Sequence, residues 1–318
     1  MIGLDLKDKK IIYELDNDSR QTFNKIAKKV GLSKDTVNYR IKKLEKEGYI
    51  LGYQTLIDFT KIGYTAVRFH ISLISTPPNK EKEIIDYLVK NPKVFLVSET
   101  EGASNIIFGI LIKETSEIND FEENFEKSFK RNIKEIKFGI YTEVFHFNRD
   151  YLVSTKDSVN KKISMKVDKK VNVNYKDISI LKMLSKNSRI PIINLAEKLK
   201  MNANTIAWRI KSLEKNKVIL GYKILFGFNK INYIYIKADL ILSDFSKEKE
   251  IVNFCENHRN IIYVVRAIGG SDVELFFEIE SVEKFLDVMK EMRNKFKEII
   301  EWRYTLFTKY HKFNYFID

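Results

Sequence analysis

An internal repeat constrains this chain more than any other feature of its sequence. The phrase LSKDTVNYRIKKLEKEGYILGY begins at Leu32, and MNANTIAWRIKSLEKNKVILGY begins at Met201, 169 residues later. From Ser33 to Tyr53 the two copies align without a gap, and eleven of 21 positions are identical. A repeat of this length is one structural unit written twice. The chain of 318 residues has room for two to four compact units.

Composition points to a globular protein without cofactor chemistry. Hydrophobic residues make up 44% of the chain, yet no apolar run is long enough to span a membrane. The opening residues MIGLDLKDKK lack the order of a signal peptide, and Cys255 is the single cysteine, so we expect a protein of the reducing cytoplasm. The sequence contains no phosphate-binding loop and no hydrolase or metalloprotease motif. The four histidines are scattered, so we predict no metal, no cofactor, no catalytic residue and no enzyme.

The positive charge is concentrated in the two segments that carry the repeat. The net charge is +13 overall, and it is +4 for residues 1–56, +1 for 57–167, +9 for 168–225 and −1 for 226–318. A charge that served only solubility would be spread more evenly along the chain. A basic excess confined to two short segments indicates a polyanionic partner, most often nucleic acid.

The first copy has the pattern of a helix-turn-helix. Asp8 is placed to cap a helix that runs through Leu15, and Thr22 is placed to cap a second helix that ends at Gly31. Ser33 would then cap a third helix over residues 34–47. Two helices joined by a tight glycine-containing turn form a motif whose second helix enters the major groove of DNA.

The third helix separates into a buried stripe and an outward polar face. Val37, Ile41 and Leu44 fall on one apolar stripe at helical spacing, which predicts the core side. Four residues near the start of the opposite face are placed to reach base edges, and three further along are placed to contact phosphates. These are, in turn, Lys34, Asp35, Asn38 and Tyr39, and then Lys42, Lys43 and Lys46.

Two other interpretations of this face stay open. A polar helix face can simply be solvated, although the preceding helix and the local basic excess favour contact with DNA. Arg40 projects beside the core stripe, where it would either bind a phosphate or pair with an acidic neighbour.

The second copy predicts a second reading helix over residues 203–216. Asn202 is its cap, and its core stripe repeats that of the first copy. Its outward face differs, because Trp208 replaces Tyr39 and Ala207 replaces Asn38. Two units with different reading faces should prefer different half-sites, so we expect a target that is not palindromic. The predicted DNA contacts of this helix are Asn204, Trp208, Arg209 and Lys211.

Each helical unit is followed by a β-rich stretch and then by the order βαββαβ, so the predicted fold class is α+β. The stretches YILGYQTLIDF and VILGYKILFGF have the pattern of the strand or wing that leaves a winged helix-turn-helix. The order βαββαβ is that of the ferredoxin-like split arrangement. The predicted boundaries are 1–57 and 169–226 for the winged units, 58–150 and 227–318 for the βαββαβ domains, and 151–168 for a polar linker.

This two-part unit resembles the Lrp/AsnC, or feast/famine, family of prokaryotic transcription regulators. The resemblance rests on LDLKDKKIIYEL, on SRQTFNKIAKKVGLSKDTVNYRIKKLEKEGYILGY and on the turn EGASN, and it covers nearly the whole chain twice. The second copy departs from the pattern, with VNYKD for LDLKD and KMN for GLS. The resemblance implies that the βαββαβ domains pair as a pseudo-dimer within one chain and place two reading helices on one face of DNA.

The resemblance also implies an amino-acid effector bound near the loop between the second and third strands of each βαββαβ domain. The matching residues are Gly102, Ala103, Ser104 and Asn105 in the first copy and Gly269, Gly270, Ser271 and Asp272 in the second. An ammonium group needs a carboxylate, so Asp272 is the better candidate of the two loop ends. A turn that only requires glycine and binds no ligand is the alternative.

Several competing functions share parts of this pattern. Outward lysines alone would suit a nucleoid-type protein with little sequence preference. Siroheme decarboxylases have the same two-part fold, but the βαββαβ halves here are nearly neutral and a polycarboxylate ligand favours cations. Duplex RNA is a poorer partner because its deep, narrow major groove does not admit a helix. Exposed sheet edges would allow further assembly between chains.

Overall fold

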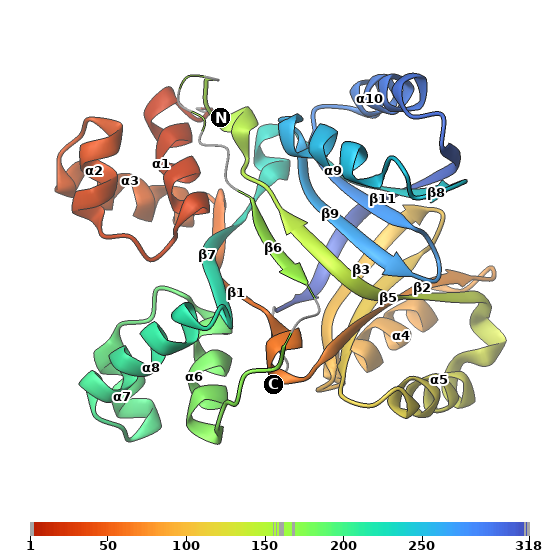
Figure 1. Cartoon of the computed structure of the whole chain (residues 1–318), viewed down its shortest axis with the longest axis horizontal. Helices are drawn as coiled ribbons and strands as arrows, with labels where there is room; N and C mark the ends of the chain where they lie inside the picture. The colour runs from red at the N-terminus through yellow and green to blue at the C-terminus, as the bar shows by residue number, and fades with distance from the viewer. Residues whose placement is uncertain are drawn as a thin grey trace.

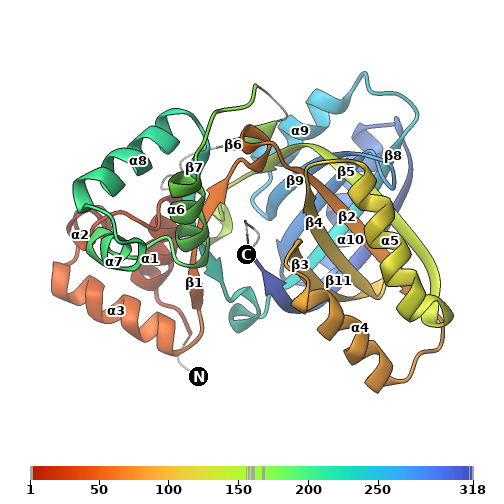
Figure 2. The same ribbon diagram turned by 90° about the horizontal axis from the view of Figure 1, so that it is seen from below.

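Two helical units lie on one side of the molecule, and a large sheet with helices on its outer face lies on the other (Figures 1 and 2). The computed structural model describes residues 3–154, 156, 158, 162–166, 169–314 and 316. Within this part of the chain, no helix is long and apolar enough to cross a membrane. The chain therefore has the α+β architecture that the repeat predicts, with each unit present twice.

The first helical unit forms where its capping residues predict. Thr22 accepts a hydrogen bond from the backbone N–H of Lys25, and Gly31 ends that helix with φ at 65°. Ser33 accepts a hydrogen bond from the backbone N–H of Thr36, at 3.1 Å, and starts the third helix. The elements are α1 (Leu6–Asn17), α2 (Phe23–Val30), α3 (Lys34–Lys46) and β1 (Ile50–Ile57).

The start of α1 differs from the prediction. Asp5, rather than Asp8, is the N-cap, and its carboxylate accepts a hydrogen bond of 2.7 Å from the Asp8 backbone N–H. Asp8 returns the contact by accepting from the Asp5 backbone N–H at 3.3 Å. The two aspartates form a reciprocal capping box, so the helix begins a turn earlier than a single cap at Asp8 would allow.

The second helical unit repeats this arrangement with different capping residues. Asn174 and Asp177 form the matching capping box, and Asn202 accepts a hydrogen bond of 2.8 Å from the Asn204 backbone N–H. Lys200 takes the left-handed position that Gly31 occupies in the first copy, with φ at 51°. The elements are α6 (Tyr175–Lys186), α7 (Ile192–Leu199), α8 (Ala203–Lys215) and β7 (Ile219–Phe226).

The strands that leave the two helical units pair with each other. β1 and β7 form a separate two-stranded antiparallel sheet, in which Thr55 lies opposite Tyr222 and Tyr53 opposite Ile224. The sequence predicts a strand or wing after each helical unit; both strands are present, and each finds its partner in the other copy. This pairing joins the two helical units rigidly, since a two-stranded ladder fixes both distance and orientation.

Each βαββαβ domain has the expected order of strands. Within each domain the fourth strand lies beside the first, the first beside the third, and the third beside the second. The first domain comprises β2 (Thr65–Leu73), α4 (Pro78–Lys90), β3 (Val94–Gly102), β4 (Ile106–Ile112), α5 (Ser116–Phe129) and β5 (Ile133–His146). The second comprises β8 (Ile234–Leu242), α9 (Glu248–Asn257), β9 (Ile261–Ile268), β10 (Val273–Ile279), α10 (Val282–Lys295) and β11 (Ile299–Phe313).

The two domains close into one sheet of eight strands, which we call the closed sheet. The long strands β5 and β11 start beside β2 and β8 of their own domain and then cross to pair with β9 and β3 of the other domain. The order is β2, β4, β3, β11, β8, β10, β9 and β5, and the β2–β5 pairing completes the ring. The pseudo-dimer within one chain is therefore confirmed. The expectation of assembly through exposed sheet edges is not supported, because the strand ends that would be free pair within the chain.

The segment 151–168 is more ordered than a linker. It begins within a short 3₁₀ turn, η3 (Asp150–Leu152), and it contains β6 (Ile163–Lys166), which pairs with the end of β5. Met165 is buried, and the backbone carbonyl of Lys166 accepts a hydrogen bond of 3.2 Å from the Thr60 hydroxyl. The described part of this segment thus adds a ninth strand, β6, beside the closed sheet and is not a free tether. Its residues 155, 157, 159–161, 167 and 168 lie outside the described ones.

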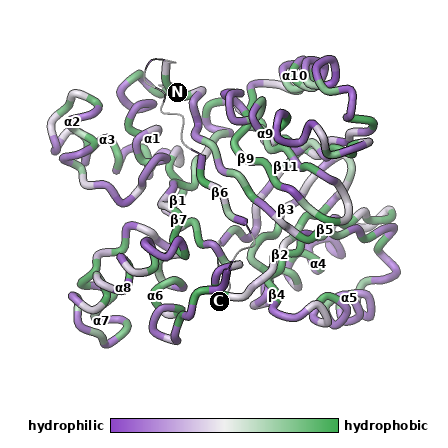
Figure 3. The backbone as a smooth tube through the Cα atoms, viewed as in Figure 1, coloured by the Kyte–Doolittle hydropathy of each residue, from purple (hydrophilic) through white to green (hydrophobic). Residues whose placement is uncertain are grey.

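Apolar residues fill the space between these layers. Figure 3 shows hydrophobic stretches along strands such as β4 and β9 and mainly hydrophilic residues along the outer helices α5 and α10. Helices α4 and α5 pack on the outer face of the first domain, and α9 and α10 pack on that of the second. Ile224 and Phe226 of β7 belong to the core of the first helical unit, so each copy helps to complete the other.

A buried cluster of charges joins the helical units to the closed sheet. Asp16 of α1 has no exposed surface and accepts hydrogen bonds from Arg149 and from Lys223 of β7. Arg149 also donates two hydrogen bonds of 2.8 Å to Glu278 of β10. Burial alone would raise the pKa of Asp16, but the charges of Arg149 and Lys223 outweigh it and hold this pKa below its usual range. One network therefore holds both helical units on the sheet.

This cluster makes folding stability depend on pH through His146. Burial, together with the nearby charge of Lys223, lowers the pKa of His146 to about 3. The unfolded chain takes up this proton near pH 6.5, so below that pH the unfolded state binds more protons and stability falls. Between pH 7.5 and pH 5.0 we expect His146 alone to remove about 2 kcal/mol of the free energy of unfolding.

Urea denaturation at pH 7.5 and pH 5.0 measures this loss. The variant His146→Asn removes the titrating group, so its loss between the two pH values should be smaller than that of the parent chain by about 2 kcal/mol. The matched control is His311→Asn, at a partly exposed histidine on β11. Equal losses for the parent and the His146 variant would contradict the prediction.

Candidate functional site

The two predicted reading helices present their polar faces to solvent. Both α3 and α8 lie on the side of the molecule away from the closed sheet (Figures 1 and 2). Each buries the predicted apolar stripe, which is Val37, Ile41 and Leu44 in α3 and Ile206, Ile210 and Leu213 in α8. The aromatic residue at the centre of each outer face is largely exposed, with 69% of Tyr39 and 65% of Trp208 accessible. Both aromatic side chains are therefore accessible to a partner.

The remaining predicted contact residues surround these aromatics. The exposed ones are Lys34, Asp35, Lys42 and Lys46 on α3 and Asn204, Lys211 and Lys215 on α8. Asn38 is half-buried beside Tyr39, and the amine of Lys43 lies 4.0 Å from the Glu47 carboxylate on the same helix. The structure thus brings all these predicted residues onto two continuous faces, with basic residues in the second half of each.

Arg40 and Arg209 have a different role from the one expected of DNA contacts. Arg40 lies 2.7 Å from carboxylate oxygens of both Asp5 and Asp8, the capping box of α1. Hydrogen bonds to these two carboxylates raise the pKa of Arg40 above its usual value. Arg209 makes the same contact with Asp177 at 2.8 Å. In the structure Arg40 therefore pairs with acidic neighbours, which is one of the two alternatives predicted for it. Each arginine joins its reading helix to the first helix of its own unit.

The two helical units meet around one pair of serines. The Ser19 and Ser188 hydroxyls lie 2.7 Å apart and are fully buried. The backbone N–H of Ser19 donates to the carbonyl of Tyr222 at 2.9 Å, and that of Ser188 donates to the carbonyl of Tyr53 at 3.0 Å. These matched contacts define a pseudo-twofold axis, which relates α3 to α8 and continues into the closed sheet.

Arginines repeat the same symmetry. Arg20 donates a hydrogen bond to the backbone carbonyl of Ser188, and Arg189 donates one to that of Ser19. Together with the β1–β7 ladder, these contacts set the separation and the orientation of the two reading helices. The relative position of the two helices is therefore set within one chain.

The two predicted effector loops lie at the far end of the closed sheet. Gly102 has φ at 109°, and a Cβ at this position would lie 2.8 Å from the carbonyl oxygen of Tyr304, so glycine is required there. Gly269 and Gly270 also have positive φ, at 85° and 78°. Ser104 and Ser271 are buried. The loops are thus tight turns packed against the opposite domain, as the glycine-turn alternative predicts for their backbone.

The structure assigns Asp272 and Asn105 the same backbone role. A carboxylate oxygen of Asp272 accepts a hydrogen bond of 2.8 Å from the Leu242 N–H, and the side-chain oxygen of Asn105 accepts one of 2.8 Å from the Leu73 N–H. The sequence distinguishes these two residues by charge and favours Asp272 as the partner of an ammonium group. In the structure both side chains do the same thing, because each accepts a backbone hydrogen bond at the end of the first strand of its domain.

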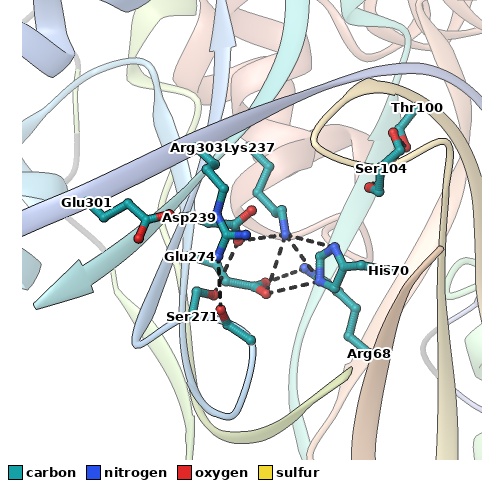
Figure 4. Close-up of polar contacts among 11 residues, drawn as sticks. Arg68, His70, Thr100, Ser104, Lys237, Asp239, Ser271, Glu274, Glu301 and Arg303 are labelled. Atoms are coloured by element: carbon teal, nitrogen blue, oxygen red, sulfur yellow. Dashed lines mark hydrogen bonds and ion pairs between the residues drawn. The ribbon is translucent and has the colours of Figure 1, made fainter. Parts of the chain in front are cut away.

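A small pocket, which we call the axis pocket, lies where the two loops approach each other. It has a volume of about 30 Å³. Both loops line it, through Ala103 of the first and Gly270 and Ser271 of the second. Its polar lining also includes His70, Ser72, Glu135, Lys137, Asp239 and Arg303, several of which are labelled in Figure 4. Acids and bases therefore face each other across one pocket on the pseudo-twofold axis.

Beneath the axis pocket lies a buried ionic cluster that sequence reasoning missed. Lys237 of β8 has no exposed surface, and its amine lies 2.8 Å from the Asp239 carboxylate and 3.5 Å from that of Glu274. Arg68 of β2 pairs with the same Glu274 at 2.6 Å. His70 lies 3.6 Å from Glu274 (Figure 4). Charged residues at inward positions of apolar strands are the signal that could have revealed this cluster.

The ionization of this cluster follows from its burial and its charges. Burial opposes the charged form of Glu274, but Lys237 and Arg68 outweigh that effect and hold its pKa far below the usual range. Burial and the neighbouring Lys237 lower the pKa of His70. The cluster therefore contains two cations and two carboxylates with a neutral imidazole, and it is balanced without a bound ion.

A second internal cavity lies closer to the helical units. Its volume is about 80 Å³, and most of its lining is aromatic. Arg68 stacks over the rings of Tyr141 and Phe276, at 4.7 and 4.8 Å from their centroids. His146 and Arg68 are its basic lining residues. We call this the central cavity, and it is much smaller than the roughly 300–1,000 Å³ of a typical small-molecule site.

Comparison with known proteins places both helical units in one class. A family model described as winged helix-turn-helix DNA-binding matches residues 4–50 and 173–219. The HTH-type transcriptional regulator FL11 of Pyrococcus horikoshii is 34% identical over 120 residues, which are 38% of this chain and 78% of the relative. An uncharacterized HTH-type transcriptional regulator of the same organism is 31% identical over 144 residues, 45% of this chain and 89% of the relative.

The architecture of the whole chain is also found in an enzyme. The crystal structure of the siroheme decarboxylase NirDL matches 96% of this chain and 92% of its own, with a TM-score of 0.65 and 13% sequence identity. At this identity the likeness shows the fold alone. The sequence predicts that the chain is not an enzyme, and this likeness contradicts that prediction. Two winged units on paired βαββαβ domains also occur in an enzyme, so the fold does not exclude one.

Proposed function

We propose that this chain binds double-stranded DNA at specific sequences through α3 and α8. The chain belongs to the Lrp/AsnC family of transcription regulators and is a tandem duplication of the family's two-domain unit. The observation that carries the proposal is the pair of exposed, basic reading faces that one rigid connection holds on the same side of the molecule. The basic excess of the chain lies in the same two segments. Phosphate contacts would supply affinity, and the residues around Tyr39 and Trp208 would supply sequence information.

Selection from fragmented genomic DNA tests this proposal. The purified full-length chain is incubated with the fragments, the bound DNA is sequenced, and the affinity of the enriched duplex is followed against salt. Enrichment of sites with two half-sites about one helical turn apart, and an affinity that falls steeply with salt, is the expected result. Retention without enrichment would instead identify a nucleoid-type binder with little sequence preference. No retention at low salt would remove DNA from the function.

Removal of single lysines should weaken binding without changing the preferred sequence. Lys42→Ala and Lys211→Ala each delete one predicted phosphate contact, so the slope of log affinity against log salt should fall by about 1 for each. Fluorescence anisotropy with the enriched duplex at several salt concentrations measures both quantities. The matched control is Lys127→Ala on α5, an exposed lysine on the outer side of the closed sheet. A variant as tight and as salt-dependent as the control would contradict the assignment.

We further propose that an α-amino acid modulates this binding from the axis pocket. Arg303 and Lys137 would hold its carboxylate, and Asp239 and Glu135 would hold its ammonium group. The pocket now has room for about one water molecule. Arg303 and Lys137 lie on its outer rim, with Lys137 3.0 Å from Glu135 and Arg303 3.4 Å from Glu301, so a ligand would enter by displacing these exposed pairs.

Calorimetry with the common amino acids tests the effector site. One amino acid should bind once per chain, because both loops line a single pocket. Arg303→Gln should weaken this binding at least tenfold, since it deletes a charge-assisted contact to the carboxylate. Lys309→Gln, on the exposed part of the same strand, is the matched control. Heat no larger than dilution for every amino acid would end the sensing proposal and leave DNA binding unaffected.

A second candidate function is the binding of a tetrapyrrole, which the whole-chain likeness to NirDL favours. His146 and Arg68 in the central cavity would be the groups to contact its iron and a carboxylate. The cavity of about 80 Å³ would have to open considerably. Addition of siroheme to the chain should shift the Soret band if this function is present, and His146→Ala should abolish the shift. An unchanged spectrum at excess protein would rule this candidate out.

A further inference from the structure

The two reading helices have the same backbone setting but unlike chemistry. Ser33 and Asn202 cap them at matching positions, and each helix is 13 residues long. Arg40 and Arg209 tie them to the first helix of their units through matching ion pairs of 2.7 and 2.8 Å. The two helices are held in the same way within their units. Any difference in the DNA sequence that they read must therefore come from their outward side chains.

Three neighbouring positions of the outward face carry that difference. Asp35 corresponds to Asn204, Asn38 to Ala207, and Tyr39 to Trp208. The α3 face thus offers a carboxylate, an amide and a hydroxyl, all of which can accept hydrogen bonds. The α8 face offers an amide, a methyl group and an indole whose N–H can only donate. The central aromatic of each face is exposed, so both sets are available to a partner.

Base edges in the major groove distinguish these two sets. An asparagine can bind adenine through N6 and N7 at once, and a carboxylate can accept from the N4 amine of cytosine. Alanine and a large apolar ring instead contact the methyl group of thymine. The α3 half-site would then be read by hydrogen bonds, whereas the α8 half-site would be read by one amide, that of Asn204, and by the apolar contacts of Ala207 and Trp208.

The second unit carries more positive charge than the first, but its reading helix carries fewer lysines. The segment 168–225 has a net charge of +9, compared with +4 for residues 1–56. On the reading helices themselves, however, Lys34 and Lys43 of α3 have Ala203 and Ser212 as their counterparts. The surplus of the second unit therefore lies outside its reading helix, where a cation meets the DNA backbone rather than the base edges.

We propose that this chain reads a directional operator, with a half-site specified through Asp35 and Asn38 of α3 and an unlike, thymine-rich half-site contacted through Ala207 and Trp208 of α8. The proposal rests on DNA binding by both helices, as proposed above. A dimer of identical chains presents two identical faces and favours a palindrome. Here the β1–β7 ladder and the Ser19–Ser188 contact hold two unlike faces in one chain, so the bound complex has a defined direction.

Selection with face-converted chains tests this proposal. The variant Asp35→Asn, Asn38→Ala, Tyr39→Trp gives α3 the α8 face, and its selected operator should become a palindrome of two thymine-rich half-sites. The reciprocal variant Asn204→Asp, Ala207→Asn, Trp208→Tyr should return a palindrome of the other half-site. All six positions are exposed or half-buried, so unfolding midpoints close to that of the parent chain are expected and serve as the control for folding.

Single substitutions measure the discrimination directly. Asn38→Ala should reduce the preference for adenine at one position of the first half-site by roughly 10- to 100-fold, without changing the second half-site. A palindrome selected by the unaltered chain would overturn the directional operator while leaving DNA binding intact. An operator unchanged by either conversion would also overturn it, because the three positions would then carry no information. Failure of the unaltered chain to enrich any DNA would overturn DNA reading itself.

Discussion

Backbone hydrogen bonds between the two halves of the chain hold together everything that the function requires. The β1–β7 ladder joins the helical units, and the crossing of β5 to β9 and of β11 to β3 closes the large sheet. Neither half has these partners by itself. A half on its own would leave the ends of two strands without hydrogen-bond partners and would expose one face of its apolar core. Either change would strongly destabilise a domain of this size.

Because both halves belong to one chain, they need not be identical. The buried charged residues differ between the two copies at equivalent positions. The register of β2 and β8 makes Arg68 and Lys237 equivalent, so two cations face each other across the pseudo-twofold axis. Glu274 contacts both cations and Asp239 supplies the second carboxylate, whereas the equivalent positions of the first domain are Ile107 and His70. Two identical chains would carry either two acids or none at this place. Both carboxylates of the ionic cluster thus come from the second copy, an arrangement that only diverged copies can have.

The same divergence separates the outer faces of the reading helices while their supports remain alike. The ion pairs of Arg40 and Arg209 and the apolar stripes beneath them repeat closely. Substitutions on an exposed helix face cost little stability, so these positions are free to change with the sequence that is read. Positions that bear on the axis, such as Ser19 and Ser188, lack that freedom because each is buried against its counterpart. The molecule therefore combines a symmetric frame with an asymmetric reading surface.

The sequence by itself determined the elements and the outward faces, because both depend on local patterns. Helical spacing identified Val37, Ile41 and Leu44, and residues with known capping preferences located the starts of α2, α3 and α8. The capping box at Asp5 and the order of the segment around β6 escaped that reasoning, since each depends on a neighbouring side chain or a distant strand. Only the tertiary structure decided that Arg40 pairs with Asp5 and Asp8, that Asp272 ends a strand, and that Lys237 lies wholly buried beside Glu274. These contacts join residues from 30 to 37 positions apart, and the contact of Arg68 with Glu274 joins residues 206 positions apart, so no local periodicity records them.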